Sequence, residues 1–392
     1  MPKDHDAYTV LAQILGNGPG STPLSPPIYQ TTAFSSADDQ VFAAMCDEPR
    51  HTGFYTRYAN PNIETLETAI ATLEGAEAGL ATASGMAAVS VALLSLVNKG
   101  EHVVAQKQLY GGTLGLLNAV MPRFGVDVTF VDQREIGDFE AAFRAETRVV
   151  FLETPSNPLM HLTDLKSVAK LARDRGVTTI VDNTVASPLN QKPLDLGVDL
   201  VVHSATKSLS GHSDVTAGAI VGRRVIIDEI WRNAYLFGMT LDPMAAWLAL
   251  RGMRTLPMRI ARYNETAMYL AGRLNSNPRV VTVHYPGLAT HPQHQLAREQ
   301  MTGFGGLLSF EVDGGESEAA RVIANLKLAH RSASFGSHST LAVHPAKMWR
   351  GMSSRGQIDK ATVPPGLIRL SVGFENAKDL ADDLEQALSA LS

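Results

Sequence analysis

Short apolar runs alternate with helical patterns through the first part of the chain. After Asn60-Pro61, apolar residues recur at helical spacing, which predicts a helix that ends at Gly75. Several apolar runs are separated by about 20 residues of amphipathic sequence, such as residues 165–175. This alternation predicts a mainly parallel sheet with helices on both faces. The runs lie at residues 102–105, 126–131, 149–152, 178–181 and 200–202.

The two ends of the chain have other patterns. The first 60 residues are rich in turn formers and have little periodicity, which predicts an extended arm. Near Met239 the pattern changes to a long helical stretch, residues 244–274, and then to a smaller α/β domain. Its strands are expected at 306–312 and 367–372, and its helices at 319–326 and 377–391. We therefore divide the chain into an arm at 1–60, a large α/β domain at 61–243 and a C-terminal domain at 244–392.

One stretch, residues 78–98, has no charged residue and is long enough to span a bilayer. Its centre holds small and polar residues, among them Thr82, Ser84 and Gly85. We therefore expect a buried strand, a tight turn and a helix start in place of a membrane span.

The composition is that of an ordinary globular protein, with 45% hydrophobic and 19% charged residues among 392. The formal net charge is −5 without a long basic run, so we expect no nucleic-acid partner. The single cysteine, Cys46, offers neither an intrachain disulfide nor a metal cluster, which suits a reducing compartment. The N-terminus lacks the apolar core of a secretory signal, so we expect a cytoplasmic protein.

A lysine follows the last apolar run of the predicted sheet. The run at 200–202 leads through His203 and Ser204 to Thr206 and Lys207. Ligands of parallel sheets bind at the carboxyl ends of strands, and partial burial there lowers the pKa of an amine toward a nucleophilic form. A Schiff-base lysine is the chemistry that this placement favours. Alone, the same residues are also compatible with a capped helix start and a solvated lysine.

Two complementary groups lie upstream. Asp182 directly follows the apolar run at 178–181, and a carboxylate there needs a cationic partner such as a protonated pyridine nitrogen. Ser84, Gly85 and Met86 lie at the predicted strand-to-helix turn, where backbone N–H groups can hold a phosphate. Lysine, acid and phosphate cradle together predict a pyridoxal 5'-phosphate (PLP) site.

These residues resemble the Cys/Met-metabolism family of PLP-dependent enzymes, which includes cystathionine synthases and lyases, methionine γ-lyases and sulfhydrylases. The resemblance covers nearly the whole chain. It implies an α/β, aspartate-aminotransferase-type fold (fold type I) and a tetramer of two active dimers. The motifs that carry it are Pro-Pro-Ile-Tyr-Gln at 26–30, Tyr-Thr-Arg-Tyr-Ala-Asn-Pro at 55–61, Glu-Thr-Pro-Ser-Asn-Pro at 153–158, the lysine segment at 203–212 and Arg-Leu-Ser-Val-Gly at 369–373.

The resemblance also implies residue roles. Lys207 is implied as the Schiff-base lysine and proton shuttle, Asp182 as the partner of the ring nitrogen, and Tyr110 as the ring that stacks on PLP and as a candidate general acid. The implied phosphate contacts are Gly85, Met86, Ser204 and Thr206, with Tyr55 and Arg57 reaching the phosphate of a neighbouring subunit. The implied clamp on the substrate carboxylate is Asn157, Ser334 and Arg369.

The chain departs from the family at the positions that set substrate choice. Cystathionine-handling members carry charges where this chain has Phe54, Gly115 and Ser339, so cystathionine and O-succinylhomoserine are expected to be poor substrates. Methionine γ-lyases carry a cysteine where this chain has Gly112. They carry a lysine–aspartate pair where this chain, by a rough alignment, has Ala234-Tyr235. Candidates for shaping the distal pocket are Phe54, Gly112, Gly115, Tyr235, Asp242, His338 and Ser339.

We therefore predict a PLP-dependent lyase that acts by γ-elimination or γ-replacement on an L-amino acid with a leaving group at Cγ. Methionine-like, homoserine-ester-like and canavanine-like substrates all stay open. The alternatives are a cystathionine β- or γ-lyase, a sulfhydrylase of O-acetylhomoserine or, outside catalysis, a silent relative of the family.

Overall fold

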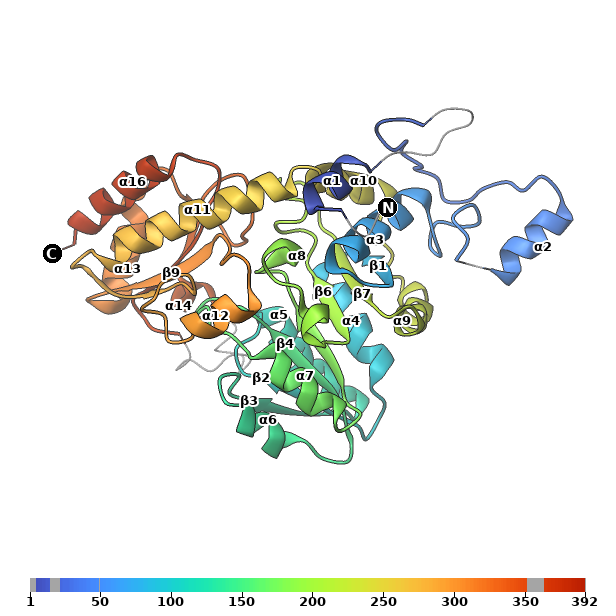
Figure 1. The fold of residues 1–392 in the computed structure, drawn as a ribbon, viewed down its shortest axis with the longest axis horizontal. Coiled ribbons are helices and arrows are strands. Elements are labelled where there is room, and N and C mark those ends of the chain that lie inside the picture. Colours follow the sequence, from blue (N-terminus) through green and yellow to red (C-terminus); the bar gives the residue numbers. More distant parts are fainter. Residues whose placement is uncertain (1–4, 15–21, 49, 351–362, 392) are drawn as a thin grey trace. The chain divides into compact units, whose positions relative to one another are not determined.

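The computed structural model describes residues 5–14, 22–48, 50–350 and 363–391 (Figure 1). The chain forms two compact units. Unit 1 comprises Met1–Leu96 and Asp199–Pro257, and unit 2 comprises Val97–Val198 and Met258–Ser392. The three-part division into arm, large domain and C-terminal domain stays a prediction.

Unit 1 is built on three strands in the order β1-β7-β6, in which β7 is antiparallel to both neighbours. Helices α3, α4 and α9 pack against these strands, and α1 and α10 pack against α3. The uncharged stretch becomes β1 and α4, as expected from its small and polar centre. The bounds are α1 Ala7–Ala12, α2 Asp39–Asp47, α3 Pro61–Glu74, β1 Ala78–Thr82, α4 Gly85–Leu96, β6 Leu200–His203, β7 Gly218–Gly222, α9 Arg224–Leu236 and α10 Pro243–Met253.

Helix α3 shows how local sequence sets an element's ends. The Asn60 side chain accepts a hydrogen bond from the Asn62 backbone N–H at the helix start, and Pro61 occupies the first helical position. Gly75 ends the helix in a left-handed conformation, with φ of 74°. The helix predicted from Asn60-Pro61 to Gly75 is confirmed.

The first half of unit 2 holds four parallel strands in the order β5-β4-β2-β3. Helices α6 and α7 cover them, with Phe139, Val150 and Val168 in the shared core. The bounds are β2 His102–Gln106, α5 Gly111–Gly115, a π-helix Leu116–Val120, a 3-10 helix Met121–Phe124, β3 Asp127–Val131, α6 Ile136–Ala142, β4 Thr147–Glu153, α7 Leu165–Arg173, β5 Thr178–Asp182, α8 Ser187–Asn190 and a 3-10 helix Pro193–Leu196.

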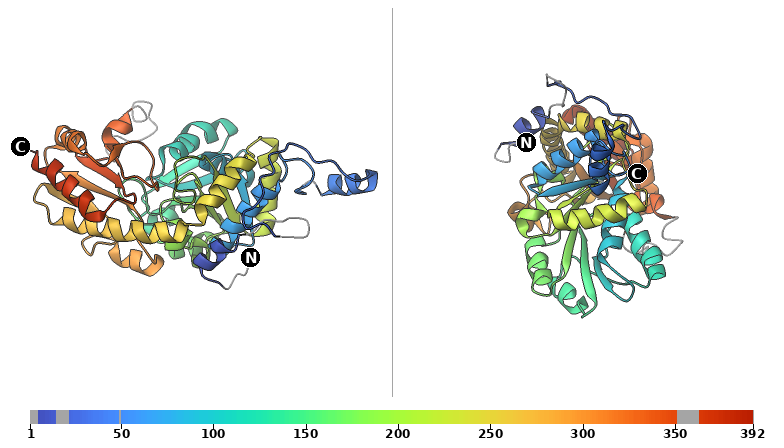
Figure 2. Two further views of the ribbon diagram at one scale, coloured as in Figure 1. Left: turned by 90° about the horizontal axis from the view of Figure 1, so that it is seen from above. Right: turned by 90° about the vertical axis from the view of Figure 1, so that its right-hand side faces the viewer.

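The second half of unit 2 is a five-stranded sheet in the order β10-β11-β12-β9-β8. Helix α13 packs against β9, β12 and α16 (Figure 2). The strands and helices expected near the C-terminus are confirmed within a few residues at their ends. The bounds are α11 Leu256–Asn275, β8 Val280–His284, α12 His294–Gln300, β9 Leu307–Val312, α13 Gly315–Asn325, β10 His330–Arg331, β11 Leu341–Val343, α14 Pro345–Met348, β12 Leu367–Ser371 and α16 Ala377–Ser389.

The structure corrects two of the expected elements. The long helical stretch at 244–274 is two helices, α10 and α11, because Pro257 lies in the first turn of α11 and cannot donate a hydrogen bond inside one continuous helix. The arm is not wholly extended, since it carries α1 and α2. Among the described residues, no helix is long and apolar enough to span a membrane.

Candidate active site

The predicted Schiff-base lysine lies in a loop of unit 1 that hydrogen bonds hold in place. After β6 the chain turns so that the Lys207 backbone N–H donates to the Ser204 carbonyl oxygen at 3.1 Å. The Thr206 hydroxyl donates to the Ala217 carbonyl oxygen at 3.1 Å and accepts from the Ala217 N–H at 3.0 Å. Lys207 itself is half-buried. The loop thus holds the lysine at the carboxyl end of a strand, as the sequence predicts.

The predicted phosphate cradle also lies in unit 1. Helix α4 begins at Gly85, and the Ser84 hydroxyl accepts a hydrogen bond from the Ala87 N–H at 3.1 Å. A Cβ atom added to Gly85 would lie 2.7 Å from the Ser204 Cβ, so only glycine lets the helix start approach Ser204 this closely. The N–H groups and dipole of a helix start favour a phosphate. Gly85, Met86 and Ser204 therefore fit the phosphate end of PLP.

Two carboxyl groups lie side by side at the strand ends of unit 2. Asp182 ends β5 and stands in register with Glu153, which ends β4. The Asp182 carboxylate accepts hydrogen bonds from the Thr184 N–H, at 3.0 Å, and hydroxyl. Burial, and then the charge of Asp182, raises the pKa of Glu153 to about 8. A cationic ring nitrogen beside Asp182 would offset the repulsion between the two carboxylates, so Asp182 fits the pyridine end of PLP.

The predicted carboxylate clamp is assembled in unit 2 around a buried arginine. Arg369 lies on β12, donates from Nη1 to the Asn157 side-chain oxygen at 3.0 Å and from Nη2 to the Ser334 carbonyl oxygen at 2.8 Å. Among the described residues, nothing pairs with its Nε by a hydrogen bond. Burial lowers the pKa of Arg369 to about 10. A buried guanidinium with two neutral partners fits an incoming carboxylate.

Tyr110 precedes α5, and the residue is 49% exposed. Its backbone N–H donates to Oε2 of Glu153 at 2.7 Å. The backbone of Tyr110 is therefore fixed while much of its side chain stays accessible. This combination suits a ring that stacks on a planar ligand.

The arm places Tyr55 and Arg57 at its surface. The Arg57 guanidinium lies over the rings of Tyr55, at 5.6 Å, and Tyr58, at 5.0 Å. The indole N–H of Trp231 donates to the Tyr58 carbonyl oxygen at 2.9 Å, and the Thr240 hydroxyl donates to the Arg57 carbonyl oxygen at 3.0 Å. The backbone of this segment is anchored, whereas the Tyr55 and Arg57 side chains stay exposed.

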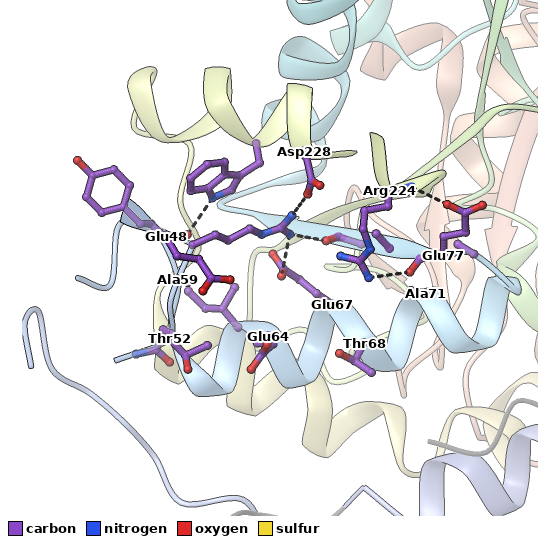
Figure 3. Close-up of a pocket in the computed structure, with 18 of the residues that line it drawn as sticks. Glu48, Thr52, Ala59, Glu64, Glu67, Thr68, Ala71, Glu77, Arg224 and Asp228 are labelled. Atoms are coloured by element: carbon purple, nitrogen blue, oxygen red, sulfur yellow. Dashed lines mark hydrogen bonds and ion pairs between the residues drawn. The ribbon is translucent and has the colours of Figure 1, made fainter. Parts of the chain in front are cut away.

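A pocket of about 550 Å³ lies in unit 1, between Glu48, residues 50–60, α3 and α9 (Figure 3). Its polar wall centres on Arg50, which binds Asp228 at 2.7 Å, Glu67 at 3.3 Å and the Gly79 carbonyl oxygen at 2.8 Å. None of the predicted site residues is among its lining residues, all of which are described. These contacts hold the base of the arm on the body of unit 1.

The candidates for the distal pocket are divided between the units. Phe54, Tyr235 and Asp242 belong to unit 1, and Gly112, Gly115, His338 and Ser339 belong to unit 2. The Asp242 carboxylate caps α10 and accepts a hydrogen bond from the Gln30 side chain at 2.7 Å. The Tyr235 ring packs on Tyr58 with centroids 4.9 Å apart. Asp242 and Tyr235 thus have structural contacts of their own, and their part in substrate choice stays a prediction.

Sequence reasoning did not single out Glu153 as a site residue. The available signal was the one that identified Asp182, namely a carboxylate directly after an apolar run, here the run at 149–152. In the structure Glu153 is buried and contacts the backbone of two predicted site residues, Tyr110 and Asn157.

Comparison with known proteins gives a consistent result. The family model for Cys/Met metabolism PLP-dependent enzymes matches residues 10–389. L-methionine gamma-lyase of Fusobacterium nucleatum subsp. nucleatum is 44% identical over 374 residues, with 94% of each chain covered. Cystathionine gamma-synthase 1, chloroplastic, of Nicotiana tabacum is 39% identical over 378 residues, and the match covers 96% of this chain and 70% of that protein.

A solved structure with a similar fold is that of a putative O-acetylhomoserine (thiol)-lyase from Campylobacter jejuni, which contains an N'-pyridoxyl-lysine-5'-monophosphate residue. It has a TM-score of 0.92 and 30% identity, and the match covers 98% of this chain and 100% of that one. The fold class, the PLP cofactor and the class of reaction, γ-elimination or γ-replacement, are confirmed by these likenesses. The chain belongs to the Cys/Met metabolism family of PLP-dependent enzymes.

Proposed function

We propose that this chain is a γ-lyase for an L-amino acid that has one α-amino-acid head group and a leaving group at Cγ. The observation that carries the substrate class is the buried clamp of Arg369, Asn157 and Ser334. It offers one guanidinium for one carboxylate, and a bidentate contact with that fork orients the head group.

Each predicted residue has a defined task in this proposal. Lys207 would hold PLP through its Nζ amine and would carry the proton that leaves Cα. Asp182 would accept a hydrogen bond from the ring nitrogen, and Tyr110 would support the ring and donate a proton to the leaving group. When bound, PLP supplies an electron sink for the charge that develops at Cα. The phosphate is held by Gly85, Met86, Ser204 and Thr206, with Tyr55 and Arg57 contributing from a neighbouring subunit.

The preference against cystathionine follows from the missing charges. Cystathionine has a second head group with its own carboxylate and ammonium. Each buried charge without a partner costs several kcal/mol, before the surrounding protein relaxes and water enters. Phe54, Gly115 and Ser339 supply no full charge where cystathionine-handling relatives supply one. A substrate with a neutral distal group avoids this cost.

Cystathionine cleavage and sulfhydrylation of O-acetylhomoserine are the second candidate functions. Cystathionine cleavage is favoured by the likeness to a cystathionine gamma-lyase from Lactobacillus plantarum, whose solved structure is 36% identical to this chain. Sulfhydrylation is favoured by the likeness to the (thiol)-lyase, which is 30% identical. The four-substrate assay below separates cystathionine cleavage from the proposed activity.

We further propose that the enzyme is a cytoplasmic homotetramer of two active dimers. Support comes from the arm, where Tyr55 and Arg57 are exposed and none of the nine residues of α2 is buried. Exposed apolar residues of α2, among them Val41 and Phe42, would be covered by a second copy.

The test is a steady-state assay of 2-oxoacid and leaving-group release with methionine, O-acetylhomoserine, canavanine and cystathionine. We expect kcat/KM for cystathionine to be about 10-fold or more below that of the best other substrate, which corresponds to about 1.4 kcal/mol of transition-state binding. If cystathionine is the best of the four, the charge argument is wrong.

A further inference from the structure

The carboxyl group of Glu153 ties together two loops at the strand ends of unit 2. Oε2 accepts a hydrogen bond from the Tyr110 N–H at 2.7 Å, and Oε1 accepts one from the Asn157 N–H at 3.3 Å. Tyr110 follows β2, and Asn157 follows β4. One buried side chain therefore fixes the backbone of Tyr110, the predicted stacking ring, and of Asn157, a residue of the predicted clamp.

Glu153 is itself held rigidly. Its backbone N–H donates to Oε1 of Gln106 at 3.0 Å, and its carbonyl oxygen accepts from Nε2 of Gln106 at 2.8 Å. Only 3% of its surface is exposed. A fixed, buried acceptor of two backbone donors can impose a geometry on both loops, because an unpaired buried donor is costly.

The contacts continue from Glu153 toward the clamp. Asn157, whose N–H binds Glu153, accepts a hydrogen bond from Arg369 through its side chain at 3.0 Å. On the other side Glu153 stands in register with Asp182, the candidate partner of the ring nitrogen. Glu153 thus lies next to three predicted site residues without being assigned to the reaction itself.

We propose that Glu153 is a positioning residue for this site: its carboxyl group holds Tyr110 and Asn157 in the geometry that binds the cofactor ring and the substrate carboxylate. The inference rests on the proposed function. A purely structural role would stabilise the fold without a specific effect on either ligand.

The decisive variant is Glu153→Gln. The amide keeps the shape of the carboxyl group but replaces one acceptor oxygen with a donor, so one of the two backbone N–H groups loses its partner. The chain offers a matched control in Asp383→Asn. Asp383 is 6% exposed and accepts the backbone N–H groups of Lys327 and Leu328, at 2.9 to 3.1 Å, outside the predicted site.

Thermal stability and three further quantities are measured on wild type and both variants. Amide hydrogen exchange of the apoprotein follows the peptides that contain Tyr110 and Asn157. Equilibrium dialysis gives the dissociation constant of PLP. Spectral titration of the PLP-loaded enzyme with L-alanine, which has no Cγ and cannot undergo γ-elimination, gives the affinity of the clamp.

In Glu153→Gln we expect exchange in at least one of the two peptides to be about 10-fold faster or more, and PLP and L-alanine to bind about 5- to 100-fold more weakly. Asp383→Asn should lose similar thermal stability yet keep wild-type affinities. The proposal is overturned if Glu153→Gln binds both ligands as wild type does, or if Asp383→Asn weakens them equally.

Two other outcomes also have a defined interpretation. If Glu153→Gln does not fold, Glu153→Asp replaces it; this variant keeps both oxygens but withdraws them by one methylene, and unchanged ligand affinities in it would overturn the proposal. If wild-type protein does not bind PLP, the proposed function fails. The exchange data on the apoprotein then still show whether Glu153 orders the two loops.

Discussion

The strand ends of unit 2 and the arm of unit 1 hold their predicted site residues in opposite ways. In unit 2, Arg369 and Asn157 are buried and bound to one another. In the arm, Tyr55 and Arg57 are exposed, although Trp231 anchors the backbone beside them and Arg57 lies on aromatic rings. One region is organised within the subunit, whereas the other presents its side chains outward.

The two regions differ in whether a single chain can complete its part of the site. The burial of Arg369 costs free energy that a bound carboxylate would recover, so the clamp is prepared for a ligand. Among the described residues, the Arg57 side chain contacts only the aromatic side chains of Tyr55 and Tyr58, and these leave it accessible to a group of opposite charge. We therefore expect the arm to act on a ligand that a second subunit holds.

The largest effect is expected for Arg369 in unit 2, where a substitution should lower catalytic efficiency without lowering stability. Replacing Arg369 with leucine, Arg369→Leu, should lower kcat/KM by about 100-fold or more, because the clamp loses its only full positive charge, worth about 2.7 kcal/mol or more. Thermal stability should stay close to wild type, since the variant removes a buried charge that has neutral partners. Differential scanning fluorimetry and steady-state kinetics measure the two effects. A large loss of stability with unchanged KM would show that Arg369 is a packing residue.

A smaller effect is expected in the arm. Arg57→Ala should weaken PLP retention by about 10- to 150-fold, since a charge-assisted phosphate contact is worth about 1.5–3 kcal/mol. Equilibrium dialysis of PLP measures this loss. Arg350→Ala, at another exposed arginine, provides the matched control and should bind PLP normally.

The same variant tests whether two subunits share a site. Lys207→Ala and Arg57→Ala proteins, each poorly active, should recover part of the activity when their subunits are exchanged. Recovery is expected because a mixed dimer contains one site with both residues intact. No recovery in dimers shown by mass spectrometry to be mixed would place Arg57 in the site of its own subunit.

The smallest expected effect is the pH dependence of unit 2. Burial lowers the pKa of both His161 and His291 to about 4. The unfolded chain binds their protons near pH 6.5 and the folded chain does not, so these two histidines should lower stability as pH drops from about 6.5 toward 4, each by about 1–2 kcal/mol at pH 5. Urea unfolding at several pH values measures this. His291→Leu should flatten the curve, whereas the exposed arm histidine variant His5→Leu should follow wild type.

Strands and capped helices were predictable because their signals are local. The apolar run at 178–181 became β5, and Asn60-Pro61 started α3. The role of Glu153 was not predictable, because its two donors come from loops that only the folded sheet brings together. The anchoring of the arm by Trp231 is equally non-local, since 173 residues separate it from Tyr58.

The most direct test of the account is to locate the lysine that binds PLP. The PLP-loaded protein should absorb at about 420 nm. Borohydride should abolish this band and leave a stable pyridoxyl group on the protein. Peptide mass spectrometry should then find that group on Lys207, and the Lys207→Ala protein should lack both the band and turnover. A pyridoxyl group on a different lysine, or normal turnover by Lys207→Ala, would show that Lys207 is not the lysine that binds PLP.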